Sequence, residues 1–263
     1  MKLALSWCER LRARTDAPPL RPRVPLAWRG ERIGSVEREF VETLVHPLLV
    51  PAGEGFNVAG DDLTDALAGL AHAMRARGFT SPWRDEAFAV RNEAGDVLGT
   101  IERAAVRPLG IPTLSVYLAG RDPQGRHWIQ RRAFDKATDA GLLDTMVGGG
   151  VPVDEDLPTA LERETWEEAG LRLAQLQTLR HGGRILLRAP STVPHGYMIE
   201  GLDWFTCVVP SGVVPVNQDG EVAHFLSMDD EEVTQRLERD EFTVDAAQVF
   251  LAASASSFSG TSP

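Results

Sequence analysis

One segment near the middle of the chain places a glycine run, an arginine and several glutamates at fixed spacing. Pro158 suits the first turn of a helix, with Asp156 or Leu157 near its N-terminal cap, and Gly170 suits its C-terminal cap. Residues at positions i, i+3 and i+4 of a helix share one face. Three glutamates have this spacing, namely Glu164, Glu167 and Glu168. The segment therefore predicts a helix with three neighbouring carboxylates.

These carboxylates repel one another, and the last two also lie at the negative end of the helix dipole. A bound divalent cation removes that conflict, because hard cations such as Mg²⁺ take oxygen ligands from a few carboxylates and from substrate phosphates. The glycine run 148–150 before the helix lets the backbone approach a metal and phosphates closely. The segment therefore predicts a Mg²⁺ site, with Mn²⁺ as an expected substitute.

The order of these residues resembles the Nudix box, the signature of hydrolases that cleave nucleoside diphosphates linked to other groups. The resemblance implies a set of metal ligands, namely the carbonyl of Gly148 and the side chains of Glu164, Glu167 and Glu168. It also implies that Arg163 orients the glutamates and acts in catalysis. Gly149 and Glu155 would shape and brace the loop before the helix.

Thr165 departs from the resemblance, because the family usually carries an aliphatic residue at this position. A buried hydroxyl needs a hydrogen-bond partner. We therefore expect the Thr165 side chain to donate to a carbonyl of the preceding helical turn, which leaves the function intact.

The negative charge of the chain lies in its second half. Of a net charge of −11, residues 1–110 hold 15 basic and 15 acidic side chains, whereas residues 111–263 hold 12 and 23. An acidic unit is a poor match for a nucleic-acid backbone. We therefore expect a small diphosphate substrate, bound through the metal, and no nucleic-acid partner.

No apolar run approaches the roughly 18 residues of a membrane span, so no membrane partner is expected. The N-terminal residues 1–15 predict an amphipathic helix and not a cleavable signal, which favours a cytoplasmic location. Its apolar positions are Leu3, Leu5, Trp7 and Leu11. Cys8 and Cys207 are far apart without zinc-site spacing, and Cys207 is expected as a small buried residue of a strand. A homodimer is an assembly state that the sequence leaves open.

A boundary near residue 111 divides the chain into an N-terminal α+β extension (1–110), a Nudix hydrolase domain (111–254) and a disordered tail (255–263). In the extension, apolar spacing predicts helices across residues 34–44 and 63–74 and a hairpin that turns at residues 93–96.

In the second unit, a hairpin is expected around residues 122–125, with later strands at 183–187, 196–209 and 224–228 and a helix at 229–238. Strands that flank a central helix, with a later helix on the other side, predict an α/β fold. The expected architecture is the Nudix α/β/α sandwich with a mixed sheet.

Other stretches resemble one branch of that family, the proteins related to the N-terminal region of fungal thiamine pyrophosphokinase, which include thiamine-diphosphate phosphatases. The matching stretches are residues 83–86, 101–111, 128–150 and 219–225. This resemblance implies hydrolysis of thiamine diphosphate, or an oxidised analogue, to the monophosphate and phosphate. Ala140 stands where the branch commonly has proline, so the substrate is less constrained than the reaction type.

Lys136 is one of two lysines in a chain with 25 arginines. A compact charge between the hairpin and the glycine run suits a substrate phosphate, and a solvated loop lysine is the alternative. Because strand side chains alternate, either Arg131 or Arg132 must face the same site. Trp83 and Arg84 suit a substrate heterocycle, or equally an anchor for the N-terminal unit.

Glu221 is the candidate for an additional metal ligand or for the general base; Glu168 is the other candidate base, and Glu200 is the second choice for the additional carboxylate. Three alternatives stay open. The chain could cleave a nucleoside-diphosphate derivative such as ADP-ribose, or catalyse a diphosphate isomerase reaction that needs Cys207. It could also bind a metabolite without catalysis, although such a decayed protein should have lost one of the three helical glutamates.

Overall fold

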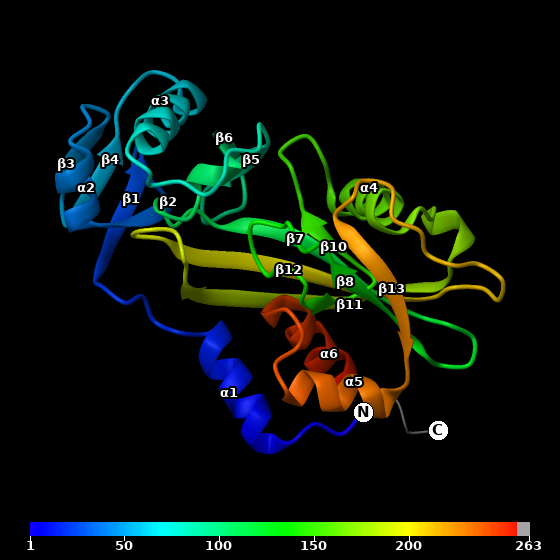
Figure 1. Cartoon of the computed structure of the whole chain (residues 1–263). Coiled ribbons are helices and arrows are strands. Elements are labelled where there is room, and N and C mark those ends of the chain that lie inside the picture. Colours follow the sequence, from blue (N-terminus) through cyan, green and yellow to red (C-terminus); the bar gives the residue numbers. More distant parts are fainter. Residues whose placement is uncertain (257–263) are drawn as a thin grey trace.

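The computed structural model describes residues 1–256 and divides them between a large sheet and a smaller N-terminal unit at one end of it (Figure 1). The expected tail at 255–263 lies outside the described residues from position 257 onward; positions 255 and 256 are the last of a helix. Among residues 1–256, no helix combines the length and apolar character needed to cross a membrane.

The N-terminal unit is built on a four-stranded sheet of order β2-β1-β4-β3, in which β1 and β4 are parallel. Its strands are β1 (Arg23–Trp28), β2 (Glu31–Glu37), β3 (Leu49–Ala52) and β4 (Gly55–Val58). Its helices are α2 (Arg38–Leu44) and α3 (Leu63–Ala76), and a short hairpin of β5 (Ala87–Arg91) and β6 (Val97–Glu102) leads into the 3-10 turn η1 (Arg103–Ala105). Leu67 and Leu70 of α3 are fully buried in its core.

A seven-stranded mixed sheet forms the second unit, with strand order β11-β12-β7-β8-β13; β10 also pairs with β7, and β9 with β8. Strands β7 and β12 are parallel, and the other neighbours are antiparallel. The strands are β7 (Thr113–Arg121), β8 (His127–Arg132), β9 (Leu143–Asp144), β10 (Val147–Gly150), β11 (Gln177–Pro190), β12 (Tyr197–Val208) and β13 (Val222–Met228).

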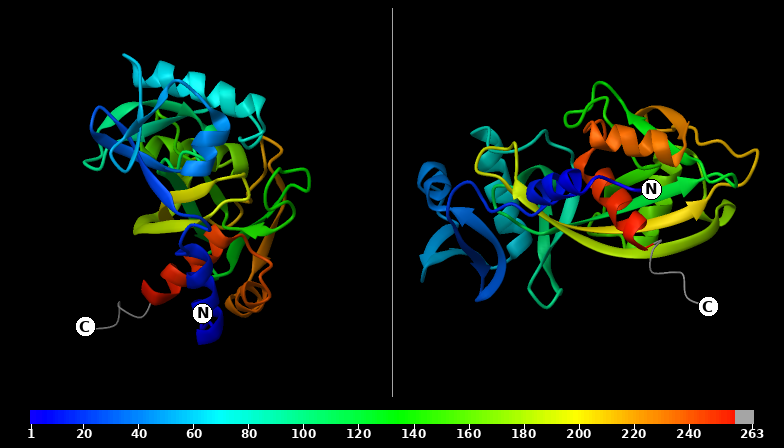
Figure 2. Two further views of the ribbon diagram at one scale, coloured as in Figure 1. Left: turned by 90° about the vertical axis from the view of Figure 1, so that its left-hand side faces the viewer. Right: turned by 90° about the horizontal axis from the view of Figure 1, so that it is seen from below.

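Helices cover both faces of this sheet, as Figures 1 and 2 show. One face carries α4 (Leu157–Ala169), followed by the 3-10 turn η2 (Leu173–Gln175); the other carries α1 (Leu5–Thr15), α5 (Asp230–Glu238) and α6 (Val244–Ser256). Side chains of β7 contact the helices on both faces of the sheet, because successive residues of a strand point to opposite faces. Val116 and Leu118 pack with α4, whereas Tyr117 and Ala119 pack with α6. The predicted α/β/α sandwich with a mixed sheet is confirmed.

The predicted helix at 63–74 and the hairpins that turn near residues 94 and 123 are present. The helix predicted across residues 34–44 is wrong in its first part, since residues 34–37 belong to β2 and the helix begins at Arg38. Tertiary pairing explains the difference. Gly34 pairs with Leu26 of β1, and any side chain at Gly34 would overlap the carbonyl of Leu109.

The N-terminal helix is confirmed, but its buried face differs from the predicted one. Trp7 and Leu11 are buried, whereas Leu5 is 81% exposed at the first turn. Helix α1 packs against α6 and the large sheet, so the first residues of the chain lie against the second unit.

Helix α6 was missed by the sequence reasoning, although its start carries a signal. Thr243 accepts a hydrogen bond from the Ala246 N–H at 3.1 Å, and the apolar residues that follow have helical spacing. Phe250 is 1% exposed and packs edge-on against Phe242 at 5.5 Å between ring centroids.

Phe250→Ala should lower the free energy of unfolding by about 3–5 kcal/mol, because it leaves a cavity between α6 and the sheet. Urea denaturation measures this, with Phe134→Ala as the control, since the Phe134 side chain is 73% exposed. A Phe250→Ala variant as stable as the control would contradict the packing of α6.

Candidate active site

Helix α4 has the ends that its sequence predicts. The Asp156 carboxylate caps it by accepting from the Thr159 N–H at 2.9 Å, and Pro158 lies in its first turn. Gly170 ends the helix in the left-handed conformation, with φ of 64°. Thr165 is fully buried, and its hydroxyl donates to the Leu161 carbonyl at 2.6 Å, so the hydrogen bond expected for this residue is confirmed.

Arg163 joins the helix to the loop before it. Its Nε donates to Glu155 at 2.8 Å, and one terminal nitrogen donates to Glu164 at 2.8 Å and to Glu167 at 2.9 Å. Its other terminal nitrogen donates to the Gly150 carbonyl at 3.1 Å. One guanidinium therefore spaces the two carboxylates and fixes them against the glycine strand β10.

Glu168 points to the same strand from the end of the helix. It is 2% exposed, and one carboxylate oxygen accepts from the Gly148 N–H at 2.8 Å and from the Gln130 amide at 3.1 Å. At Gly149 any side chain would overlap the Glu164 carboxylate. Gly149 is thus needed for the close approach of α4 to β10.

The surrounding protein only partly balances the negative charge of Glu168, which is buried, and of Glu164, which is mostly buried. Burial raises the pKa of Glu164 to about 7, and burial followed by the charge of Glu164 raises the pKa of Glu168 well above its ordinary value. No three His, Cys, Asp or Glu side chains within residues 1–256 already converge in a metal-binding geometry. The donor set nevertheless fits a hard cation, because buried carboxylate oxygens and a glycine backbone are the ligands that Mg²⁺ takes.

Lys136 and Glu221 form an ion pair beside these glutamates. The Lys136 side chain is 13% exposed, which excludes the alternative of a freely solvated loop lysine. The Glu221 backbone carbonyl accepts from the Ala133 N–H at 2.8 Å, so the loop that carries Lys136 is tied to the start of β13. Both residues act electrostatically on the helix, since Glu221 contributes to the raised pKa of Glu164 and Lys136 opposes the raised pKa of Glu168.

Strand alternation separates the two neighbouring arginines of β8. Gln130 reaches Glu168, so Arg132, two residues later, shares the face of the strand that looks toward the glutamates. Arg132 also pairs with the buried Asp144 at 3.3 Å. Arg131 lies on the opposite face and donates to the Gly141 carbonyl at 2.6 Å.

Trp83 packs within the N-terminal unit. Its ring stacks on His72 of α3 with centroids 5.2 Å apart, and its indole N–H donates to Asp85 at 2.8 Å. These contacts all lie inside the N-terminal unit, so they show neither a free platform for a heterocycle nor an anchor on the second unit. Arg84 is exposed, and its positive charge acts on Glu221, so it belongs to the electrostatic surroundings of the site.

Three contacts between the two units escaped the sequence reasoning. The Val153 N–H donates to the Ala87 carbonyl of β5 at 2.9 Å, and a side chain at Gly150 would overlap the Phe88 ring. Arg107 forms an ion pair with Glu200, so the Glu200 carboxylate binds this arginine and does not join Glu168. No local spacing could indicate these pairs, because their members are distant in the sequence.

Cys207 is 3% exposed in the core between the sheet and α4, as predicted for a small buried residue. Burial raises the pKa of its thiol to about 12. A protonated thiol packed in an apolar core is not suited to the acid–base role that a diphosphate isomerase reaction requires.

Several known proteins are similar to this chain in sequence. Nudix hydrolase 20 of Arabidopsis thaliana is 30% identical over 169 residues, which cover 63% of this chain and 45% of the plant protein. Nudix hydrolase 24 of the same plant is 26% identical over 195 residues, 73% of this chain and 53% of its own. The chain thus spans about half the length of these two relatives. The uncharacterized Nudix hydrolase YfcD of Escherichia coli strain K12 is 30% identical over 155 residues, 59% of this chain and 79% of YfcD.

Among solved structures, DR0079 from Deinococcus radiodurans superposes with a TM-score of 0.51 and 23% identity, over 64% of this chain and 98% of that protein, which supports the fold. The family model of the NUDIX domain matches residues 112–249, more than half of the chain. The chain therefore belongs to the Nudix family.

Proposed function

We propose that this protein hydrolyses a diphosphate linkage with the help of Mg²⁺, and that its substrate is thiamine diphosphate or an oxidised analogue. The products are the monophosphate and inorganic phosphate. The observation that carries the reaction type is the cluster of Glu164, Glu167 and Glu168 beside β10. Glu168 is buried, the Glu164 side chain is 12% exposed, and Arg163 binds both Glu164 and Glu167.

The metal ligands in this proposal are the Gly148 carbonyl and the three helical glutamates. Bound Mg²⁺ supplies polarisation of the phosphoryl oxygens and a more acidic water molecule. Arg163 bridges Glu164 and Glu167, and Glu155 holds Arg163 from the other side. This support lets the carboxylates bind a cation without a large rearrangement of the helix.

Two residues are candidates for the proton acceptor. Glu168 is buried and its raised pKa makes its ionised form the stronger base. For Glu221, burial acts to raise the pKa, but the hydrogen bond and charge of Lys136 hold it below the ordinary value. Glu221 therefore stays ionised. An ionised carboxylate suits both the role of proton acceptor and the role of additional metal ligand.

Positive side chains around the glutamates suit the substrate phosphates. Lys136 and Arg132 approach from the second unit, and Arg84 from the N-terminal unit. Their charge would offset the negative charge that develops on the leaving phosphate. The thiamine assignment itself rests on the resemblance of residues 83–86, 101–111, 128–150 and 219–225 to the thiamine-related branch.

The position of Trp83 supports a second class of substrate. Trp83 stacks on His72, so it is not a free aromatic platform for the heterocycle of thiamine. A nucleoside-diphosphate derivative such as ADP-ribose is therefore the second candidate substrate. Pure metabolite binding is less favoured, since all three helical glutamates and Arg163 are retained. The cytoplasmic location also stays a prediction, and the two plant relatives are named chloroplastic.

Glu168→Gln should lower kcat for Mg²⁺-dependent hydrolysis by about a thousandfold or more, because it removes a carboxylate that would bind the metal or accept the proton of the attacking water. The glutamine can still accept from the Gly148 N–H, so the melting temperature should change little. Glu162→Gln is the matched control on the same helix, since its carboxylate faces Arg172 at 3.6 Å. Retained turnover in Glu168→Gln would refute the proposed reaction.

Thiamine diphosphate and ADP-ribose distinguish the two substrate classes. With Mg²⁺ and no added phosphatase, the wild-type protein should release inorganic phosphate from thiamine diphosphate, whereas cleavage of ADP-ribose yields two organic phosphates. We expect kcat/KM for thiamine diphosphate to be at least about tenfold higher, which corresponds to about 1.4 kcal/mol of transition-state binding. The reverse order of the two substrates would overturn the thiamine assignment and leave the reaction type standing.

A further inference from the structure

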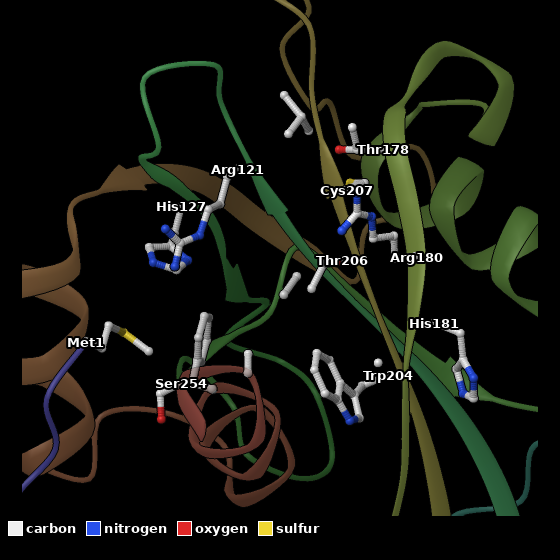
Figure 3. Close-up of a pocket in the computed structure, with 15 residues that line it drawn as sticks. Met1, Arg121, His127, Thr178, Arg180, His181, Trp204, Thr206, Cys207 and Ser254 are labelled. Carbon is white, nitrogen blue, oxygen red and sulfur yellow. The ribbon is translucent and has the colours of Figure 1, made fainter. Parts of the chain in front are cut away.

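A cavity lies between strands β11 and β12 and helix α6, with a volume of about 660 Å³ (Figure 3). Its position differs from that of the glutamates. Gly148, next to the glutamates, pairs with Tyr117 of β7. The cavity is lined by Arg121, which lies four residues further along β7. At about 3.3 Å per residue, Tyr117 and Arg121 are about 13 Å apart along the strand. The cavity is large enough for a compact organic ligand.

Two arginines from different strands give the cavity positive charge. Arg121 comes from the end of β7 and Arg180 from β11, and in Figure 3 the Arg180 guanidinium extends in the direction of Arg121. Arg121 has an ion-pair partner, Asp230, at 3.3 Å. Within residues 1–256 the Arg180 guanidinium has no hydrogen bond or ion pair. Such a pair of cations in an acidic protein suits a phosphate group.

His127 adds an unsatisfied polar group to the cavity wall. The residue is 3% exposed, its Nε2 lies 2.8 Å from an Asp230 oxygen, and its buried Nδ1 has no partner in the described part of the chain. Burial, reinforced by Arg121, lowers the pKa of His127. We assign the neutral ring with hydrogen on Nε2, which leaves Nδ1 as an acceptor for a ligand donor such as a hydroxyl or amino group.

Trp204 forms part of the cavity wall on the β12 side. It is 5% exposed, and Gly182 of β11 lies so close to its ring that a side chain there would overlap it. Strand β11 is irregular at this wall, with register shifts on both sides of residues 180–181. Thr178, which also lines the cavity, has φ of 50°, a left-handed conformation that β-branched residues rarely adopt. These bulges turn Arg180 and His181 relative to a regular strand.

We propose that this cavity is a second binding site for a small ligand that joins a planar ring and hydroxyl or amino donors to a phosphate group, the chemistry of a nucleoside monophosphate. The ring lies along Trp204, and Arg121 and Arg180 bind the phosphate. The site is distinct from the metal-binding glutamates and does not depend on the proposed hydrolysis.

The probe is AMP, titrated calorimetrically into the full chain in a buffer with EDTA, so that the phosphate cannot bind through a divalent cation at the glutamates. Saturable binding with Kd below about 100 μM is expected, which corresponds to at least about 5.5 kcal/mol. Adenosine and inorganic phosphate should each bind at least about tenfold more weakly, because each lacks one half of the recognised chemistry.

Arg180→Gln and Arg121→Gln should each weaken AMP binding at least about tenfold. The matched control is Arg188→Gln, because Arg188 lies on the same strand but pairs with Asp16 outside the cavity. Glu168→Gln should bind AMP as the wild type does. Absence of saturable AMP binding, equal binding by Arg180→Gln, equal affinity for adenosine, or loss of binding in Glu168→Gln would each overturn the proposal.

Tryptophan fluorescence gives a second readout that does not depend on the arginine variants. AMP should change the emission of the wild-type protein, and Trp204→Phe should lose that change while Trp166→Phe retains it. An unchanged response in Trp204→Phe would place the ligand elsewhere and contradict the assignment. Trp166 is a suitable control because it lies on α4, outside the cavity.

Discussion

Crowding of like charge at the end of α4 is the constraint on which the site depends. Glu168 is buried and Glu164 is mostly buried. Arg163 compensates part of the charge by pairing with Glu164 and Glu167, and it also donates to the Gly150 carbonyl. A side chain at Gly149 would overlap the Glu164 carboxylate, whereas side chains at Gly148 and Gly150 would overlap the rings of Tyr117 and Phe88. The helix, its arginine and the strand therefore form one electrostatic unit, and a cation would complete its charge balance.

The N-terminal unit contacts the loop before α4 and the glycine strand β10 directly. Its strand β5 bonds to the loop before α4 through Ala87 and Val153, and Phe88 covers Gly150. Arg107, just before the second unit, neutralises Glu200 inside the large sheet. The loop before α4 is thus held from both units, so substitutions in the extension should affect the position of the glutamates.

Local patterns predicted the parts of the fold that short-range interactions determine. The caps at Asp156 and Gly170, the turn near residue 123 and the bond of Thr165 all join residues within a few positions. Long-range packing decided the rest. Gly34 was assigned to a helix, but it pairs with β1, and the partnership of Gln130 with Glu168 spans 38 positions. Strand alternation limited the choice to Arg131 or Arg132, and only the contact of Gln130 shows which one faces the glutamates.

The central claim is that α4 and β10 are built to hold a divalent cation. Crystals grown with Mn²⁺, measured at a wavelength where manganese scatters anomalously, test this claim directly. The account predicts an anomalous peak in contact with the Gly148 carbonyl and with carboxylate oxygens of Glu164, Glu167 and Glu168. A well-ordered structure at saturating Mn²⁺ with no peak there, or with the Arg163 network unchanged and the metal bound elsewhere, would contradict it.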